Sequence, residues 1–368
     1  MFKKIAVLGA GNGGLATAAD LALKGLEVNL FQLPEFKNTI EPIIQKGGIT
    51  VEGEIEGFAK IKKITTNIEE ATKNVDLIII AIPLLALDKF TEVCGPYLKD
   101  NQVVVLNMAN TFGALRFYNK LITIGVKAKI KLAELSSLTY ACRISKPGTV
   151  KILLKAKNIV FSAFPSKDNE VIFNDFKMLY PSIIEGKNVL ETTLNNGNPI
   201  SHPAVCILNA GRIEYAKGEY YHYLEGITPS VARVIKAMDD ERLKLCHYFK
   251  LKEIPVEERL LRIGYFSKRE NNNLYQYYHT SKIFSKIKGP ASLSERYLME
   301  DMPYGLVPWI KLANNFNIKM PIAEAVVAIG SSLMGINFFK EGISIKDIGL
   351  EKMSVEQINK YLWSGIKE

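Results

Sequence analysis

The chain has 368 residues, of which 48% are hydrophobic, and this length allows two domains that each bury a core. The formal net charge of +9 comes mainly from lysines scattered along the sequence, which favours anionic small molecules as ligands. No recognised nucleic-acid-binding module accompanies this charge, so we predict no nucleic-acid partner.

The start of the chain alternates between strand-like and helix-like patterns. A short apolar strand at Lys4–Leu8 leads into a Gly-x-Gly-x-x-Gly turn, and an alanine-rich helix (Leu15–Lys24) and a second strand (Glu27–Phe31) follow. Glycines at such a turn let the backbone approach a pyrophosphate, whose charge the helix N-terminus stabilises. We therefore predict dinucleotide binding at this turn. The residues predicted to bind the cofactor here are Gly9, Gly11, Asn12, Gly13 and Gly14.

Two continuous apolar strands follow, as is typical of parallel strands covered on both faces. Val75–Ile82 ends at Pro83, and Gln102–Leu106 leads into a loop that contains Asn110. The ends of such strands face the crevice where an open α/β sheet binds its ligand, so Pro83 and Asn110 are further candidates for cofactor binding. The next strand-like segments predict an antiparallel extension of the sheet, at residues 129–135, 138–144, 150–154 and 158–162, before a helix at 169–179.

The second half of the chain has almost entirely helical patterns. Helices are expected at residues 203–217, 229–249, 308–316, 321–332 and 355–363. With a boundary near Gly186, we predict an α/β, Rossmann-type dinucleotide-binding domain at residues 1–187 and an all-helical domain at residues 188–368.

The segment Asn198–Ala204 opens the helical half and contains one histidine. Ser201 is expected to cap a helix whose first turn tolerates Pro203, which would place His202 at the mouth of that helix. Histidine is the side chain best suited to move protons near neutral pH, so His202 is a candidate catalytic residue. A proline-rich linker with an incidental histidine is the alternative.

The cysteines and the apolar segments of the chain indicate its cellular compartment. The four cysteines are far apart, with no Cys-x-x-Cys and no histidine at metal-ligand spacing, so we predict neither disulfides nor a metal site. The apolar run Leu77–Leu87 is too short to cross a bilayer, and Ile322–Phe339 contains Glu324 and glycines. We predict a cytoplasmic protein without membrane contact. Ile322–Phe339 could be core or the interface of a homodimer, so the oligomeric state stays open.

Together these residues resemble the opine dehydrogenases over nearly the whole chain. The resemblance rests on residues 33–36, 110–115, 140–143, 202–204 with 209–212, 225–231 and 300–308, in this order. Members of that family condense the amino group of an amino acid with a 2-oxo acid, usually pyruvate, and reduce the imine with NADH or NADPH. The resemblance therefore implies an NAD(P)-dependent oxidoreductase that acts on CH–NH groups.

The resemblance also implies roles for individual residues. The reaction needs a proton donor at the carbonyl oxygen, which would be His202, and Asp301 would orient the imidazole. Arg296 would hold the oxo-acid carboxylate, because an arginine fork fits a carboxylate bidentately. Without the resemblance, Arg296 and Asp301 would be read as a surface ion pair. The further candidates for substrate binding are Tyr140, Cys142 and Asn198; for Cys142 a buried strand end is the alternative.

The chain departs from the family pattern at places that affect specificity. Gln32 stands where an NAD-preferring site has a carboxylate, about 20 residues past the glycine turn. Gln32 cannot repel a 2′-phosphate, and Lys37 could reach one, whereas Glu35 could replace the missing acid. We therefore expect use of both NADP(H) and NAD(H), with a lean to NADP(H). Met108-Ala109 and Thr139 also differ from the pattern, so neither the amino acid nor the 2-oxo acid is assigned.

Two other readings stay open. Glycerol-3-phosphate dehydrogenases and 2-dehydropantoate reductases also have a Rossmann domain followed by a helical domain, but rely on a lysine in the helical part. A regulator that senses NAD(P)H without turnover would not need His202 and Asp301, which are both present.

Overall fold

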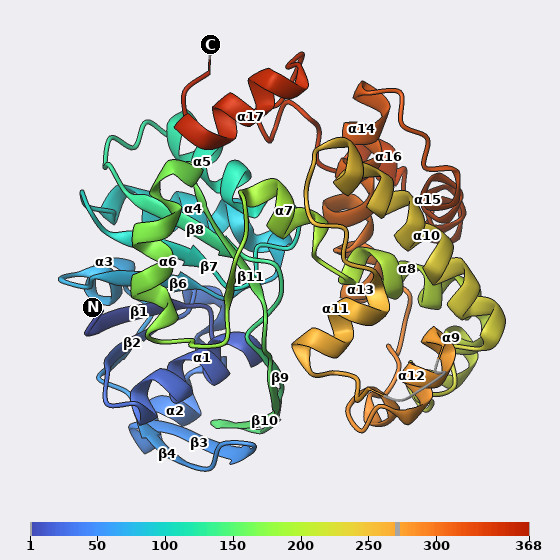
Figure 1. Ribbon diagram of the computed structural model, residues 1–368. Coiled ribbons are helices and arrows are strands. Elements are labelled where there is room, and N and C mark those ends of the chain that lie inside the picture. The colour runs from blue at the N-terminus through green and yellow to red at the C-terminus, as the bar shows by residue number, and fades with distance from the viewer. Residues whose placement is uncertain (1, 269–272, 368) are drawn as a thin grey trace. The chain divides into compact units, whose positions relative to one another are not determined.

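The computed structural model describes residues 2–268 and 273–367 (Figure 1). It divides into two compact units, Met1–Thr193 with Glu356–Glu368, and Leu194–Val355. The predicted class, an α/β Rossmann-type domain followed by an all-helical domain, is confirmed. Within the described ranges, none of the helices combines the length and the apolar character needed to span a bilayer.

The first unit is built on an eight-stranded sheet, counted over the described residues, in the order β12-β11-β8-β7-β6-β1-β2-β5. All its neighbours pair in parallel except β8 and β11, which are antiparallel. The apolar runs of β6 and β7 are buried along their whole length, as predicted. The strands are β1 (Lys4–Leu8), β2 (Glu27–Phe31), β5 (Lys63–Thr65), β6 (Leu77–Ile80), β7 (Val103–Leu106), β8 (Lys131–Leu135), β11 (Val160–Phe164) and β12 (Ile184–Glu185).

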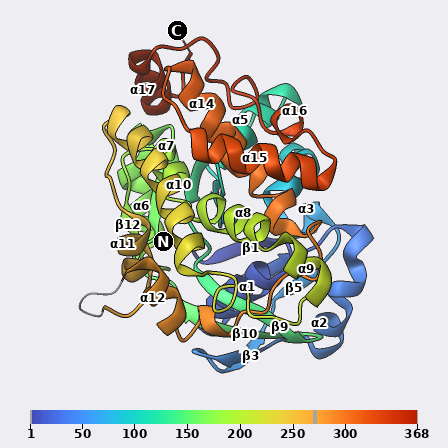
Figure 2. The ribbon, with the colours of Figure 1, turned by 90° about the vertical axis from the view of Figure 1, so that its right-hand side faces the viewer.

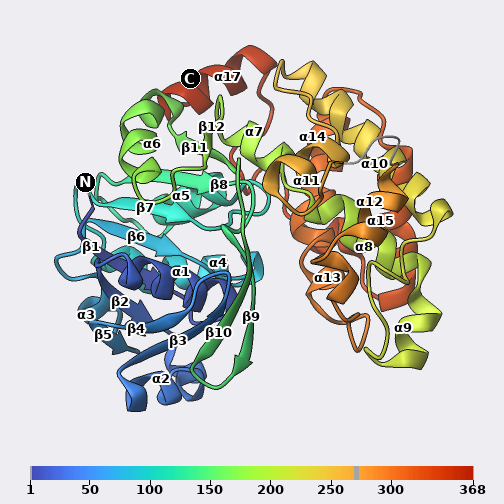
Figure 3. The same cartoon turned by 60° about the horizontal axis from the view of Figure 1, so that its bottom comes forward.

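A second, smaller sheet receives part of the predicted antiparallel extension. Of the four predicted strands, β8 and β11 continue the large sheet. The other two, β9 and β10, pair with each other in an antiparallel manner, and β10 also pairs with the earlier strand β3, which gives the order β4-β3-β10-β9. The two sheets are visible in Figure 3, where β3, β9 and β10 lie apart from β6, β7 and β8. The strands of the small sheet are β3 (Gly48–Gly53), β4 (Gly57–Lys60), β9 (Tyr140–Lys146) and β10 (Thr149–Lys155).

The last helix of the chain belongs to the first unit, although the predicted boundary at residues 187/188 had assigned it to the second domain. Its Tyr361 packs edge-on against Phe164 of β11, with ring centroids 5.2 Å apart. The helices of this unit are α1 (Asn12–Leu23), α2 (Glu41–Lys46), α3 (Ile68–Thr72), α4 (Leu87–Cys94), α5 (Gly113–Thr123), α6 (Asn169–Lys177) and α17 (Val355–Ser364), and α7 (Val189–Leu194) leads into the second unit.

The second unit is helical, and α8 lies among its other helices in Figure 2. Helices α10, α13 and α15 pack on α8. The predicted helix at 203–217 is interrupted at Asn209, whose side chain donates to the carbonyls of Val205 and Gly226 (both 2.9 Å). The helices are α8 (Asn198–Leu208), α9 (Ala210–Ala216), α10 (Pro229–Tyr248), α11 (Val256–Ile263), α12 (Leu274–Thr280), α13 (Arg296–Met299), α14 (Val307–Asn315), α15 (Pro321–Met334) and α16 (Phe338–Glu341), with a π-helical turn at Met302–Leu306.

One carboxyl group in the first unit is completely buried. Glu134 of β8 accepts the backbone N–H of Ala114 (2.8 Å) and contacts the hydroxyl of Thr192, which also donates to the Val189 carbonyl (2.9 Å). Burial raises the pKa of Glu134 to about 7, although both hydrogen bonds act in the opposite direction. A protonated Glu134 can donate to the Thr192 oxygen, which leaves the Thr192 proton for Val189.

We expect the Glu134→Gln variant to gain stability over the wild type as the pH rises. Because the folded-state pKa of about 7 lies above the usual value of 4.5, the unfolded chain loses this proton between about pH 4.5 and 7 while the folded chain keeps it, so the free energy of unfolding falls as the pH rises through this range. Glutamine can keep both contacts and does not ionise, so its advantage should grow by about 2–3 kcal/mol between pH 5 and 8. Denaturant unfolding of both proteins at the two pH values measures this, and a difference independent of pH would contradict it.

Candidate active site

The glycine turn between β1 and α1 has the shape that a dinucleotide phosphate requires. Gly9 has a φ of 105°, and a Cβ there would lie 2.7 Å from the carbonyl oxygen of Ala81. A Cβ at Gly14 would lie 1.8 Å from the Gly9 carbonyl oxygen, so only glycine lets α1 pack this closely on β1. At Gly11, which precedes α1, a Cβ would meet open space, where a phosphate can approach the helix N-terminus. These residues fit a nicotinamide dinucleotide.

Asn12 and Gly13 attach the small sheet to the glycine turn. Asn12 Oδ1 accepts the backbone N–H of Ile144 (2.7 Å), and the Asn12 carbonyl accepts the thiol of Cys142 (3.2 Å). A Cβ at Gly13 would lie 2.8 Å from Leu138, just before β9. Burial raises the pKa of Cys142 to about 12, so its thiol is neutral. Cys142 is buried and lies within β9, and its part in substrate binding stays a prediction.

Tyr140 lies in the core of the first unit. Its hydroxyl donates to Asp20 Oδ2 of α1 (2.7 Å) and lies 3.3 Å from the hydroxyl of Tyr180. Lys24 pairs with the same Asp20 carboxylate (2.8 Å). Through these contacts Tyr140 joins β9 to α1, which is a structural task within this unit.

Pro83 and Asn110 follow β6 and β7, neighbouring parallel strands of the large sheet. They therefore lie at the same edge of that sheet as the glycine turn, which follows β1. Pro83 is exposed, and Asn110 is buried with a φ of 52°. In the loop before Asn110, the Asn107 amide donates to the hydroxyls of Thr17 (3.2 Å) and Thr139 (2.9 Å). The structure thus brings these two predicted residues together with the glycines.

A cavity of about 480 Å³ lies beside the end of β2. Glu35 and Lys89 bring opposite charges to its wall. Gln32 turns its amide toward its own loop, where Oε1 accepts the Leu33 N–H (3.0 Å) and Nε2 donates to Thr39 (3.4 Å). The cavity is lined by Phe31, Leu33, Pro34, Glu35, Thr66, Asn67, Ile68, Lys89 and Val93.

The helix that carries His202 begins earlier than predicted. In α8, Gly197 is the N-cap and Pro199 lies in the first turn, where its missing N–H costs nothing. The prediction that Ser201 caps the helix was therefore wrong, and Ser201 instead donates to the Gly197 carbonyl one turn back (3.1 Å). His202 lies inside the helix rather than at its mouth, on the same face as Asn198, one turn earlier.

His202, Asp301 and Arg296 come together in the second unit. Nδ1 of His202 lies 2.7 Å from Oδ2 of Asp301, and both side chains are buried. Burial raises the pKa of Asp301 to about 7, while the guanidinium of Arg296 acts in the opposite direction. Within the described part of the chain, Oδ1 of Asp301 is buried without a hydrogen-bond partner. Arg296 of α13 donates through Nε to Glu300 (3.2 Å), and half of its side-chain surface is exposed.

Aromatic residues that the sequence analysis did not single out surround His202. The hydroxyl of Tyr223 lies 2.9 Å from Nε2 of His202, and the ring of Tyr297 lies 4.3 Å from the imidazole. His222 stacks on Tyr297 and meets Tyr223 edge-on, with centroids 4.8 and 4.7 Å apart. Burial, helped by His202, lowers the pKa of His222 to about 3, so this second imidazole is neutral.

The segment after Tyr223, part of the family pattern, holds this tyrosine in place. Glu225 contacts Arg212 and accepts the backbone N–H of Tyr221 (2.7 Å). A Cβ at Gly226 would lie 2.2 Å from the His222 carbonyl, so the chain can fold back only with glycine here. The charged, small and capping residues of this segment thus position the aromatic residues beside them. This segment was the signal in the sequence that could have indicated Tyr223.

Two family models match the chain. The model of the NAD/NADP octopine/nopaline dehydrogenase alpha-helical domain matches residues 185–334, and that of ketopantoate reductase PanE/ApbA matches residues 5–162. The chain is 32% identical to the opine dehydrogenase of Arthrobacter sp. (strain 1C), over 97% of this chain and 98% of the relative.

Solved structures show the same fold. An octopine dehydrogenase with NADH and pyruvate matches with a TM-score of 0.78 at 18% identity, covering 99% of this chain and 98% of that one. A yersinopine dehydrogenase with NADP⁺ matches with a TM-score of 0.72 at 16% identity, covering 99% of each chain.

Proposed function

The chain belongs to the opine dehydrogenase family, whose members are NAD(P)-dependent oxidoreductases acting on CH–NH groups, and on this premise we propose that His202, Asp301 and Arg296 form its active site. The reaction is the reductive condensation of an amino acid with a 2-oxo acid. For the 2-oxo acid we propose pyruvate, which the similar octopine dehydrogenase binds. The observation that carries the proposal is the buried contact of 2.7 Å between His202 Nδ1 and Asp301 Oδ2.

Arg296 binds the carboxylate of the 2-oxo acid. Its guanidinium carries a permanent charge, and the neighbouring Glu300 and Asp301 raise its pKa further against the effect of burial. Its Nε is held by Glu300, while half of the side-chain surface stays open to a ligand. Arg296 lies on the same segment of the chain as Asp301, the partner of His202. A carboxylate bound to Arg296 therefore holds the adjacent carbonyl carbon of the 2-oxo acid near Asp301.

His202 supplies the proton. With Nδ1–H donated to Asp301, the imidazole is held in one orientation and its Nε2 is the nitrogen that exchanges a proton with the substrate. That proton converts the carbinolamine hydroxyl into a leaving water, while the Asp301 carboxylate stabilises the imidazolium that gives it. The glycine turn would hold the nicotinamide dinucleotide, which when bound supplies the hydride for the C=N bond.

A second candidate is a reductase that acts on a single carbonyl compound. The match of residues 5–162 to the ketopantoate reductase model favours this reading for the first unit. The match of residues 185–334 to the octopine/nopaline dehydrogenase model, and the His202–Asp301 contact within that range, favour the condensation.

Oxidation of NADH or NADPH in a panel of 2-oxo acids and amino acids separates the two candidates. The proposed function predicts oxidation only when a 2-oxo acid and an amino acid are both present. A carbonyl compound that supports the full rate by itself would select the reductase. Oxidation with none of the pairs, by an enzyme that binds NAD(P)H, would reject both.

For the cofactor we propose that both NADP(H) and NAD(H) are used, with a lean to NADP(H). The cavity beside β2 is of the right kind for the adenosine end, since it lies at the strand end where Rossmann domains hold the ribose. Lys89 in its wall offers a 2′-phosphate a positive charge, and Glu35 opposes it. The solved structures of similar proteins include one with NADH and one with NADP⁺ bound.

The Gln32→Glu variant is expected to shift preference toward NADH by about tenfold. A carboxylate can still accept the Leu33 N–H, but it repels a 2′-phosphate and loses the bond to Thr39. The measurement is kcat/KM for NADH and NADPH in both proteins. Unchanged selectivity would mean that Gln32 does not select the cofactor.

A further inference from the structure

We propose that the hydroxyl of Tyr223 carries the proton between Nε2 of His202 and the substrate oxygen. This inference rests on the proposed function, since it concerns the route of the same proton. It assigns a catalytic task to a residue that precedes the Glu225–Val231 segment of the family pattern and lies outside the three residues proposed above.

The geometry around His202 determines which nitrogen can serve the substrate. Nδ1 lies 2.7 Å from the buried carboxylate of Asp301, so Nε2 is the nitrogen left to give a proton. Nε2 in turn lies 2.9 Å from the Tyr223 hydroxyl, which is hydrogen-bonding distance. Tyr297 packs on the imidazole, with ring centroids 4.3 Å apart. A proton that leaves Nε2 in this arrangement meets the oxygen of Tyr223 first.

The ring of Tyr223 is held firmly where it is. It stacks on Tyr278 with a centroid distance of 5.5 Å and an interplanar angle of 4°, and it contacts Phe284 at 4.5 Å. His222 meets it edge-on at 4.7 Å, and only 4% of the residue is exposed. A substrate that displaced the hydroxyl from Nε2 would have to disturb this packing, whereas a relay leaves it intact.

A phenol is suited to this transfer because its oxygen can accept one proton while it donates another. The Nε2–H bond of the imidazolium breaks and an O–H bond forms at Tyr223, while the original Tyr223 O–H proton moves to the hydroxyl oxygen of the carbinolamine. The C–O bond then breaks, its electron pair stays on the oxygen, and water leaves. The nitrogen lone pair forms the C=N bond. Tyr223 ends neutral and unchanged, and His202 ends as neutral imidazole.

In the competing account, the Tyr223 hydroxyl only occupies the position of the substrate oxygen in the free enzyme, and the substrate displaces it on binding. The two accounts give opposite results when the hydroxyl is removed. A relay loses its proton donor, so the Tyr223→Phe variant should lose turnover. A place-holder competes with the substrate, so the same variant should bind substrate more tightly and keep or raise its turnover.

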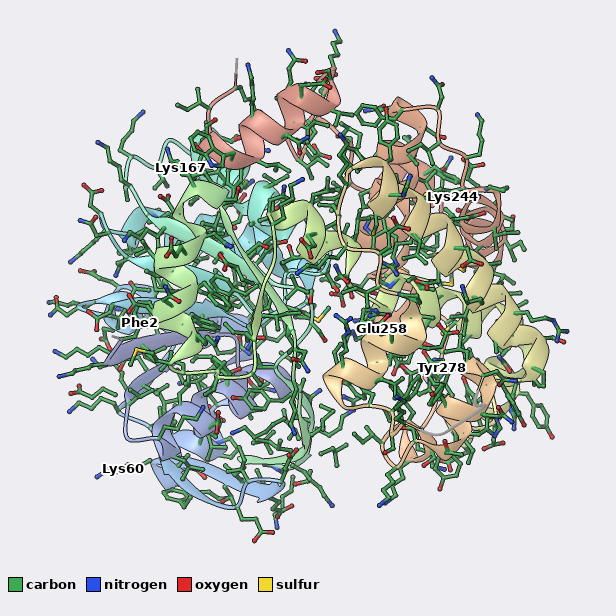
Figure 4. The ribbon with its side chains drawn as sticks, viewed as in Figure 1. Phe2, Lys60, Lys167, Lys244, Glu258 and Tyr278 are labelled. Carbon is green, nitrogen blue, oxygen red and sulfur yellow. The ribbon has the colours of Figure 1, made fainter. Side chains whose placement is uncertain are left out.

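The test compares Tyr223→Phe with Tyr278→Phe, the same loss of a hydroxyl on the ring stacked against it (Tyr278 is labelled in Figure 4). For Tyr223→Phe we expect kcat to fall about 10²-fold, with both KM values within about threefold of the wild type. For Tyr278→Phe we expect kcat within about threefold. When Tyr223→Phe is added to the His202→Ala variant, kcat should fall little further, because the two side chains act in the same proton transfer.

Circular dichroism and NAD(P)H titration identify a variant that fails to fold. In that case 3-fluorotyrosine at position 223 keeps the ring and the hydroxyl but makes the phenol more acidic, so a relay predicts a changed kcat and solvent isotope effect. Unchanged values would overturn the relay. Equal losses in Tyr223→Phe and Tyr278→Phe, or full turnover of Tyr223→Phe, would also overturn it. If His202→Ala retains full activity, the proposed function fails instead.

Discussion

The His202→Ala variant is expected to lower kcat by about 10²–10⁴-fold, which is the usual effect of losing a positioned acid or base. The substitution removes the imidazole that joins Asp301 to Tyr223. It also leaves a buried carboxyl without its partner, and the raised pKa of Asp301 lets that group become neutral. Steady-state rates at saturating amounts of both substrates and the cofactor measure the effect.

The cofactor provides the control for His202→Ala. The glycine turn lies in the first unit, so NAD(P)H binding followed by fluorescence should be nearly unchanged. Loss of turnover with loss of cofactor binding would indicate a folding defect. Near-normal turnover would remove His202 from the chemistry.

The Arg296→Lys variant is expected to raise KM for the 2-oxo acid by about 10- to 100-fold and to change KM for the amino acid much less. Lysine keeps the charge and can pair with Glu300, but it cannot offer the parallel N–H groups of the guanidinium. Initial rates with each substrate varied in turn measure both constants. An unchanged KM for the 2-oxo acid would exclude Arg296 as the anchor, and equal increases would indicate a general defect.

The parts of the fold that depend on local pattern could be predicted from the sequence. The glycine turn, the buried strands β6 and β7, and the long helix α10 each carry a periodicity or turn signal of their own. The partners of β9 and β10 could not be predicted, because β3 and β4 (Gly48–Lys60) are short, glycine-containing and partly exposed. The place of α17 on the first unit depends on Tyr361 meeting Phe164, a contact between residues far apart in the sequence.

For the candidate site, the sequence pointed to residues whose chemistry is distinctive. His202, Asp301 and Arg296 come together as the resemblance implied, although their roles remain proposals. Tyr223 and Tyr297 were missed, because a tyrosine by itself does not show whether its hydroxyl meets a histidine or its ring fills a core. For Tyr223, the neighbouring segment of the family pattern was the one available signal. Tyr140 belongs to the family pattern and bonds to Asp20 inside the first unit, and its part in substrate binding stays a prediction.

The most direct test of the central claim is the mass of the product formed with a ¹⁵N-labelled amino acid, a 2-oxo acid and NAD(P)H carrying deuterium at the transferable position. Reductive condensation predicts one product that contains the ¹⁵N label and one deuterium. Its mass should equal the summed masses of the two substrates less one oxygen atom, with the added mass of the two isotope labels. A deuterated 2-hydroxy acid without ¹⁵N, formed at the same rate when the amino acid is omitted, would contradict the account.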